Sequence, residues 1–259
     1  MHPYLNIAIK AARTAGKIIV DATLHPNLVE VRKKSELILD LVTSIDQASE
    51  DAIIKTILRA YPTHNIKAEE TGEQFNNSEI TWVIDPLDGT FNFVHGFPFF
   101  AVSIAVMNGE SIEHGVVYNP VSDELFTASR GAGAQLNNKR IRCSQNNKLQ
   151  EALLAIDLDL LLQLSQSNSK EITKSLPLGS NRYVGAAALE LAFVACGRID
   201  GYCEPGLKPW DIAAGALLVR ESGGYITDFN GKTDFLELGN IVAGNPKIHQ
   251  QLLECIVKW

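Results

Sequence analysis

The four cysteines of this 259-residue chain include no C-x-x-C pair, and none has histidines near it at the spacing of zinc ligands. Neither a disulfide framework nor a structural zinc site is therefore expected. Cys196 falls in an apolar run of helical character, so we assign it to the core. This use of cysteine fits a reducing compartment.

Long apolar runs and an excess of basic residues are also missing. No apolar stretch approaches the roughly 18 to 20 residues of a membrane span, and the N-terminus lacks the pattern of a signal peptide. Lys and Arg number 23 against 30 Asp and Glu, a net charge of −7, which argues against a surface built mainly to hold nucleic acid. We expect a soluble cytoplasmic protein with no membrane partner.

The most informative stretch follows an expected buried strand at residues 81–84, which is mainly apolar and β-branched. Two carboxylates, Asp85 and Asp88, come directly after it. Pro86 fixes one backbone angle and Gly89 can adopt angles that are closed to other residues, so the segment predicts a rigid elbow. Such an elbow turns both carboxylates to one side.

The elbow also leaves the Leu87 carbonyl and the Gly89 and Thr90 amides outside sheet pairing. Clustered hard oxygen ligands beside N–H groups suit Mg²⁺ and a phosphate. Pro-x-Asp-Gly is also ordinary turn chemistry, so a simple turn is the alternative.

Further acids stand at comparable positions. Glu69 would follow a short strand at 64–68, whereas Glu73 is expected in a solvated turn. Asp211 would open a helix at 211–222, either as its N-cap or as part of an acidic cluster with the Asp85 elbow. Glu204 ends a strand and is either solvated or a hydrogen-bond acceptor for a polyol.

The rest of the chain reads as a layered α/β protein, with helices and strands alternating in its second half. Segment 25–41 is expected to be a loop or an irregular hairpin, and alternation near 102–106 favours a half-buried strand. The expected helices are 3–23, one capped by Thr43 or Ser44 and stopped by Pro62, 158–174, 186–196, 211–222 and 246–257. The remaining expected strands are 99–108, 111–118, 124–128, 152–157, 181–184, 199–203, 224–228 and 240–243.

Two motifs resemble the signatures of the inositol monophosphatase family. They are Asp-Pro-Leu-Asp-Gly-Thr at 85–90, and Trp-Asp-Ile-Ala-Ala-Gly at 210–215 followed by Glu-Ser-Gly-Gly at 221–224. Glu69 and Glu70 are similar to the third element of the family. The similarity continues through 97–98, 101–105 and 197–201, spans nearly the whole chain, and points to the bacterial SuhB-type branch.

The resemblance implies a layered αβαβα sugar-phosphatase sandwich. An N-terminal α+β part (1–145) would carry the main metal site, and a C-terminal α/β part (146–259) would complete the metal and substrate site. The implied activity is Mg²⁺-dependent hydrolysis of a phosphate monoester, inositol-1-phosphate, by in-line attack of a metal-activated water. Two to three Mg²⁺ per site are implied.

The resemblance also assigns the metal ligands. One Mg²⁺ would be held by Glu69, Asp85 and the Leu87 carbonyl, and a second by Asp85, Asp88 and Asp211. Glu69 would help to hold a third, weaker ion. Four carboxylates packed together without cations would repel one another strongly, so metal binding would remove that penalty.

The remaining implied roles concern the water and the substrate. Glu69 and the Thr90 hydroxyl would position and deprotonate the water, with Asp46 hydrogen-bonded behind Thr90. The residues expected to contact the phosphate or the sugar are Asp88, Gly89, Thr90, Gly185, Ala186, Glu204 and Asp211.

Three features depart from the family pattern. Phe91 stands where many relatives have a second Thr, which affects local loop packing. Ala186 replaces a common Ser or Thr and removes one hydroxyl from the substrate side. Segment 34–39 is longer and more apolar than the usual mobile loop, whose lysine near the metals would be Lys34.

Alternatives remain for the function. Within the same chemistry they are a broader sugar- or polyol-phosphate phosphatase, a histidinol phosphatase or a 3′-nucleotide phosphatase. From a different class comes a role as a partner of RNA polymerase and Nus factors in transcription antitermination, which is implied by the SuhB-type branch and independent of catalysis. A homodimer and sensitivity to lithium are also implied by the resemblance.

Overall fold

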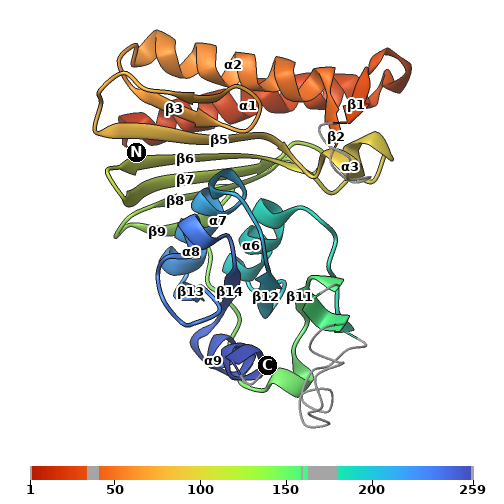
Figure 1. Ribbon diagram of the computed structural model, residues 1–259, viewed down its shortest axis with the longest axis vertical. Helices are drawn as coiled ribbons and strands as arrows, with labels where there is room; N and C mark the ends of the chain where they lie inside the picture. The colour runs from red at the N-terminus through yellow and green to blue at the C-terminus, as the bar shows by residue number, and fades with distance from the viewer. Residues whose placement is uncertain (1, 34–40, 159, 163–179, 258–259) are drawn as a thin grey trace.

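The computed structural model describes residues 2–33, 41–158, 160–162 and 180–257 (Figure 1). The α-helices of this part are α1 (Pro3–Thr23), α2 (Ser44–Ala60), α3 (Thr90–Val94), α6 (Ala187–Ala195), α7 (Pro209–Glu221), α8 (Phe235–Leu238) and α9 (Pro246–Val257). Short 3-10 helices lie at Pro26–Leu28 and Leu149–Glu151.

The strands divide between two large groups and one short hairpin. They are β1 (Val31–Lys33), β2 (Leu41–Thr43), β3 (Asn65–Ala68), β4 (Gly72–Gln74), β5 (Ile80–Asp88), β6 (Ala101–Asn108), β7 (Ser111–Asn119), β8 (Glu124–Ser129), β9 (Gly133–Leu136), β10 (Lys139–Arg140), β11 (Leu154–Ile156), β12 (Gly201–Glu204), β13 (Tyr225–Thr227) and β14 (Ile241–Gly244).

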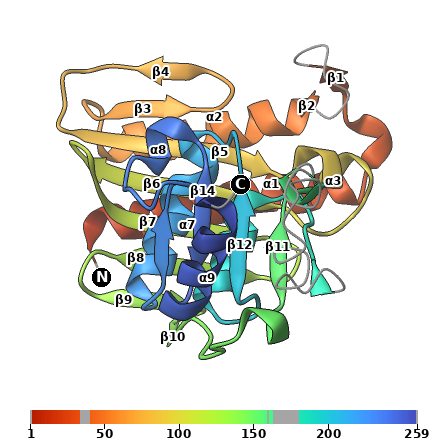
Figure 2. The same cartoon turned by 60° about the horizontal axis from the view of Figure 1, so that its bottom comes forward.

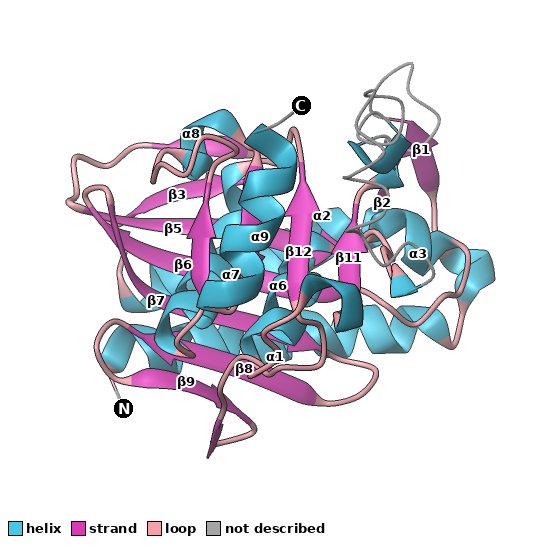
Figure 3. Ribbon diagram, turned by 90° about the horizontal axis from the view of Figure 1, so that it is seen from below, coloured by secondary structure: helices cyan, strands magenta, loops and turns pink. Residues whose placement is uncertain are grey.

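The elements stack in layers (Figure 1). Helices α1 and α2 cover one face of the large sheet, and α6 and α7 cover its other face. The small sheet lies behind α6 and α7, and α9 packs on its outer side (Figures 2 and 3). This α-β-α-β-α order confirms the layered sandwich expected from the sequence.

The large sheet has the strand order β10-β9-β8-β7-β6-β5-β3-β4, and the small sheet has the order β11-β12-β14-β13. Within the large sheet, β3 and β5 run parallel, with Ala68 opposite Ile84. The Glu69 amide continues this pairing by donating to the Ile84 carbonyl at 3.2 Å. Because parallel strands end at the same edge of a sheet, Glu69 is brought next to Asp85.

Strand β6 is buried on both sides, so the expectation of a half-buried strand was wrong. Val102 and Ile104 belong to the core beneath α1 and α2. Ser103 and Ala105, on the other face, are each only 1% exposed because α7 packs over them. The Ser103 hydroxyl stays satisfied at this depth by donating to the Trp210 carbonyl at 3.0 Å.

The N-terminal helices follow the sequence pattern closely. Helix α1 has the expected bounds, and its apolar stripe is buried against the large sheet. Helix α2 begins after Thr43, whose side chain accepts from the Asp46 amide while the Asp46 carboxylate accepts from the Thr43 amide. This reciprocal capping box fixes the start of α2, and the helix ends at Ala60, before Pro62.

Other expectations had mixed outcomes. Strands β1 and β2 form the expected hairpin, whose connecting residues 34–40 lie outside the described residues. The expected helix at 158–174 lies mainly outside them too. The strand expected at 181–184 is wrong: Asn181 makes a single bridge to Leu154, and the Val184 carbonyl accepts from the Asn92 side chain instead of a strand. Segments β4, β9, β10, α3 and α8 were not expected.

One hydrophobic cluster joins residues of both halves of the chain, with Val83 and Phe126 packed together with Leu218 and Ile241. The division at residues 145 and 146 stays a prediction. None of the helices in the described ranges combines the length and the apolar character of a membrane-spanning helix.

Candidate active site

Acidic side chains from distant parts of the chain line one cavity of about 170 Å³. They come from the ends of β3, β5 and β12 and from the start of α7. The lining residues are Glu69, Asp85, Leu87, Asp88, Gly89, Thr90, Tyr183, Gly185, Ala187, Glu204, Leu207 and Asp211. We call this space the acidic cavity.

The elbow after the expected strand is a β-bulge within β5. Asp85 lies opposite Ser103 and Asp88 lies opposite Ala101, so three steps along β5 match two steps along β6. Residues three apart on a regular strand face opposite sides of the sheet, and the extra residue of a bulge reverses this. Both carboxylates therefore line the acidic cavity.

Gly89 ends the bulge with φ 89° and is the N-cap of α3. A side chain is disfavoured there, because the positive φ strains other residues and a Cβ would lie in tight contact, 3.0 Å from the Phe99 carbonyl oxygen and 3.2 Å from the Ala186 methyl group. Helix α3 begins at Thr90, so the amides next to Gly89 belong to the first turn of a helix, where N–H groups have no partner within the helix.

Glu69 is positioned from behind by helix α2. The Glu50 carboxylate, fully buried on α2, accepts from the Glu70 amide at 2.9 Å and from the Thr71 amide at 2.7 Å. These two bonds hold the turn after β3 in place. Sequence reasoning did not identify Glu50, because a carboxylate on a helix face usually marks solvated surface.

Asp211 enters the cavity from the first turn of α7. The helix begins at Pro209, so the expected start at residue 211 and the N-cap role of Asp211 were wrong. Asp211 is the third residue of the helix, and its Oδ2 accepts from the Lys208 amide at 2.7 Å. The hydrogen bond from Ser103 to the Trp210 carbonyl ties this turn to β6 at the position opposite Asp85.

Asp88 is linked to the other half of the chain. Its Oδ2 accepts from the Ala188 amide, in the first turn of α6, at 2.8 Å. A hydrogen bond between residues 100 positions apart fixes α6 against the elbow. The start of α6 also brings Gly185 and Ala187 to the cavity.

The carboxylates strongly affect one another's ionisation. Asp85 is 2% exposed, and burial raises its pKa well above the ordinary value, with further increases from the charges of Glu69, Asp88 and Asp211. Burial also raises the pKa of Asp88 well above its ordinary value, and Asp211 adds to the shift. Without a cation, the site therefore favours protonated carboxyl groups.

The donor set fits magnesium in its chemistry. Every candidate ligand is a carboxylate or carbonyl oxygen, the kind that Mg²⁺ binds. Within the described ranges, no three His, Cys, Asp or Glu side chains already form a compact metal-binding group. Mg²⁺ usually takes one or two carboxylates per ion and keeps several waters, so acids spaced around one cavity suit it better than a closed cage would.

Thr90 connects the cavity to α2. Its hydroxyl lies 2.8 Å from Asp46 Oδ1 and 3.0 Å from the Leu87 carbonyl oxygen. The other Asp46 oxygen accepts from the Thr43 amide at 2.8 Å, and Asp46 itself is fully buried. The capping box of α2 therefore also orients the acceptor of the Thr90 hydroxyl.

Comparison with known proteins identifies the family. Residues 1–258 match the inositol monophosphatase family. The chain belongs to the inositol monophosphatase family. It is 47% identical over 256 residues to "Nus factor SuhB" of Escherichia coli K12, covering 98% of this chain and 95% of that protein.

Solved structures of the family superpose closely. The crystal structure of the extragenic suppressor protein suhB from Bartonella henselae has a TM-score of 0.92 at 38% identity, covering 99% of both chains. An inositol monophosphatase from Anabaena has a TM-score of 0.82 at 35% identity, covering 98% of this chain and 95% of that one. The chain therefore has the phosphatase fold of the inositol monophosphatase family.

Glu204, the last residue of β12, is a cavity carboxylate that is held by two tyrosine hydroxyls. Glu204 accepts from the Tyr183 hydroxyl at 3.2 Å and from the Tyr202 hydroxyl, and it lines the acidic cavity together with Tyr183. Burial raises the pKa of Glu204 to about 7, while the two phenols act to lower it. The solvated alternative for Glu204 was therefore wrong.

Next to Glu204 lies a second buried acid, Glu190 of α6, with no exposed surface. Its Oε1 accepts from the Val184 amide at 2.9 Å, and its Oε2 has no hydrogen-bond partner within the described residues. Burial raises the pKa of Glu190 to about 9, so it is a neutral acid at pH 7.

Several site residues differ from the sequence reasoning. Ala186 is buried behind Gly89 and does not line the acidic cavity, whereas Ala187 does. Tyr183 and Leu207 line the cavity and were not foreseen. Lys34 lies outside the described residues. The one sequence signal for Tyr183 was its position as an aromatic residue two places before Gly185.

Proposed function

We propose that the protein hydrolyses phosphate monoesters in a Mg²⁺-dependent reaction, with inositol-1-phosphate as substrate. The observation that carries the proposal is the convergence of Glu69, Asp85, Asp88 and Asp211 on one cavity beside the Thr90–Asp46 pair. Membership of the inositol monophosphatase family supports the same reaction class.

Glu69, Asp85, Asp88, Asp211 and the Leu87 carbonyl would hold two to three Mg²⁺. Bound there, these ions would lower the pKa of a coordinated water and would neutralise the charge that develops on the phosphate and the leaving oxygen. The mutual repulsion that raises the carboxyl pKa values is then replaced by attraction to the cations.

The attacking water is oriented by the chain itself. The Thr90 hydroxyl donates to Asp46, so its lone pairs remain for accepting a hydrogen bond from a water on the cavity side. Glu69, at the end of β3, takes the proton as general base. The amides of Gly89 and Thr90, at the start of α3, hold the phosphate oxygens as negative charge builds up.

The leaving group is recognised on the opposite wall. Asp88, Asp211 and Glu204 accept hydrogen bonds from the hydroxyls of the polyol, and Gly185 and Ala187 contact the ring. The alternatives within the reaction class are other sugar or polyol phosphates, histidinol phosphate and 3′-nucleotides.

A turnover panel tests the proposal. Phosphate release would be measured with Mg²⁺ on inositol-1-phosphate, fructose-1,6-bisphosphate, histidinol phosphate and adenosine 3′,5′-bisphosphate. We expect the highest kcat/KM with inositol-1-phosphate and none without Mg²⁺. Hydrolysis of none of these esters by the folded, Mg²⁺-supplied protein would contradict the proposed function, and a higher kcat/KM with another ester would reassign the substrate.

A second candidate function comes from the name "Nus factor" carried by a relative that is 47% identical over 98% of this chain. We propose that the protein also acts with RNA polymerase and Nus factors in transcription antitermination in the cytoplasm. An Asp88→Asn protein would be used to capture these partners from purified components. Capture without turnover supports a second role, and turnover loss with no capture leaves the enzyme alone.

The family likeness also supports three simpler proposals. A homodimer predicts twice the chain mass of 28.3 kDa in light scattering. Lithium sensitivity predicts loss of turnover as Li⁺ is added at fixed Mg²⁺. The division into parts 1–145 and 146–259 predicts preferred proteolytic cleavage between them.

A further inference from the structure

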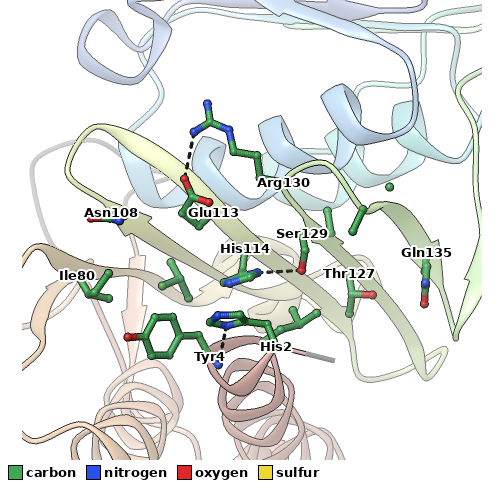
Figure 4. Close-up of a pocket in the computed structure, with 15 residues that line it drawn as sticks. His2, Tyr4, Ile80, Asn108, Glu113, His114, Thr127, Ser129, Arg130 and Gln135 are labelled. Carbon is green, nitrogen blue, oxygen red and sulfur yellow. Dashed lines mark hydrogen bonds and ion pairs between the residues drawn. The ribbon is translucent and has the colours of Figure 1, made fainter.

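A second cavity, of about 640 Å³, lies at the end of the large sheet next to the N-terminus of α1 (Figure 4). It shares no lining residue with the acidic cavity. Its walls come from the first turn of α1, from β7 and β8, and from β9. Its volume is within the range of about 300 to 1,000 Å³ typical of small-molecule sites.

The floor of this cavity is formed by side chains with unused hydrogen-bonding capacity. Thr127 of β8 pairs with Val116 of β7 on one side and with Gln135 of β9 on the other, so these three side chains share one face of the sheet. Val116 lies in the core beneath α1. Thr127 is only 6% exposed, yet no hydrogen bond from its hydroxyl or from the Gln135 carboxamide to protein is found in the described part of the chain.

One wall of the cavity consists of aromatic rings. The imidazoles of His2 and His114 stack with centroids 4.4 Å apart and an interplanar angle of 29°. Tyr4 meets the His2 ring edge-on at 4.9 Å, and Figure 4 shows the three rings grouped together. His2 Nδ1 accepts from the Tyr4 amide at 3.2 Å, and His114 Nδ1 lies 2.8 Å from Ser129 Oγ.

The lining carries little net charge. Glu113 and Arg130 neutralise each other, with Oε1 and Nη1 3.1 Å apart. The pKa of His114 is lowered by burial and by His2, an effect that Glu113 opposes, so the buried imidazole is uncharged at neutral pH. The cavity therefore differs in kind from the acidic cavity, which five carboxylates line.

We propose that this second cavity binds an uncharged purine heterocycle of nucleoside size. Imidazole and phenol rings stack on planar bases, and a hydroxyl with a carboxamide can pair with the donors and acceptors at a base edge. A polyol would match the Thr127 and Gln135 groups but offers no planar ring for contact with the aromatic wall of His2, Tyr4 and His114. A phosphate would find no unpaired cation at the Glu113–Arg130 pair.

Isothermal titration of the full chain with adenosine and with guanosine tests this proposal. Matched comparison ligands are myo-inositol, which has hydroxyls but no aromatic ring, and N-acetyltryptophanamide. The latter has an aromatic ring but lacks the donors and acceptors at the edge of a purine base. The variants are Thr127→Val and Gln135→Leu, with Gln150→Leu as control because Gln150 is exposed and far from the lining. Thermal melting checks that each variant is folded.

We expect saturable binding of at least one purine nucleoside, weakened about five- to tenfold in Thr127→Val and in Gln135→Leu and unchanged in Gln150→Leu. Phosphate release should stay at the wild-type rate in all three variants. The proposal is overturned if neither nucleoside binds saturably to the wild type, if both lining variants bind normally, or if either comparison ligand binds as tightly. Weakening by Glu204→Gln alone would move the site to the acidic cavity and also overturn it.

Discussion

The Thr90 hydroxyl donates to Asp46 Oδ1 at 2.8 Å across 44 positions of sequence, and Asp46 is itself held by the cap of its own helix. An acceptor fixed in this way leaves the hydroxyl little choice of orientation. Two acceptors lie within reach of its single proton, Asp46 Oδ1 at 2.8 Å and the Leu87 carbonyl oxygen at 3.0 Å, and its lone pairs remain for a water. On the proposed function, Asp46 is therefore a positioning residue that acts through Thr90.

Replacing Asp46 by Asn should lower kcat by about a hundredfold and change KM little, because water orientation matters only in the chemical step. Steady-state kinetics on inositol-1-phosphate would measure both constants. Asp51→Asn, on an exposed position of the same helix, is the matched control and should keep both constants. A normal kcat for Asp46→Asn would show that the hydrogen bond between Asp46 and Thr90 is not needed for the chemical step.

Replacing Asp85 by Asn should reduce turnover by at least about a hundredfold. Without metal the variant should be more stable than the wild type at pH 7 to 8. The folded pKa of Asp85 is raised above its unfolded value, so its contribution to stability is present below the unfolded pKa and is lost as pH rises toward the folded pKa.

Thermal melting with and without Mg²⁺ measures how the stability of the wild type and of Asp85→Asn depends on the metal. The wild type should gain stability on addition of Mg²⁺, because the ion binds only the folded carboxylates, and Asp85→Asn should gain much less. Asp123→Asn, on an exposed loop far from the cavity, serves as the control. An equal rise in melting temperature for wild type and Asp85→Asn would contradict the assigned metal site.

Replacing Tyr183 by Phe should raise the pKa of Glu204, because the Tyr183 hydroxyl donates to its carboxylate and lowers that pKa. Glu204 has a pKa of about 7. If its ionised form accepts the sugar hydroxyls, KM should fall as pH rises through this value in the wild type. In Tyr183→Phe the same fall should occur at higher pH, as shown by KM measured across pH.

The kcat of Tyr183→Phe should change much less than KM, since the phenol faces the sugar side. Tyr225→Phe, 57% exposed and outside the acidic cavity, should leave the pH profile unchanged. Identical KM profiles for the wild type and Tyr183→Phe would show that the phenol does not control Glu204.

Replacing Glu190 by Gln should flatten the dependence of stability on pH. The folded pKa is about 9 and the unfolded value 4.5, so the wild type loses stability as pH rises between these values. The loss is at most about 1.4 kcal/mol per pH unit. Urea unfolding of both proteins at several pH values measures the difference, with the exposed Glu110→Gln as control. Parallel curves for wild type and Glu190→Gln would be the contrary result.

Much of the fold was predictable because the apolar periods of α1, α2 and α9 and the turn residues between β6, β7 and β8 act locally. Burial on both faces of β6 was not predictable, because it depends on α7, more than 100 residues later. Ser103 looked like a solvent-facing residue, but α7 buries it and the carbonyl of Trp210 accepts the hydrogen bond of its hydroxyl.

Sequence reasoning predicted the acidic residues of the site but not the residues that hold them in position. Asp85 and Asp88 stand in a recognisable motif, but the bulge that turns them to one side depends on pairing with β6. Glu50 carries no local signal and Tyr183 only its position before Gly185, since their partners, the Glu70 amide and Glu204, are 20 and 21 positions away. The family likeness supplied the candidate ligands, and the tertiary structure was needed to find the residues that position them.

The hydrogen bond from the Ala188 amide to Asp88, described above, has a consequence for synthesis of the chain. Asp85 and Asp88 leave the ribosome early, but Ala188 and Asp211 are made more than 90 residues later. A nascent chain that ends before α7 therefore has Asp85 and Asp88 without the opposite wall of the acidic cavity. On the proposed function, the site can be completed only after α7, in the last third of the chain, has been made.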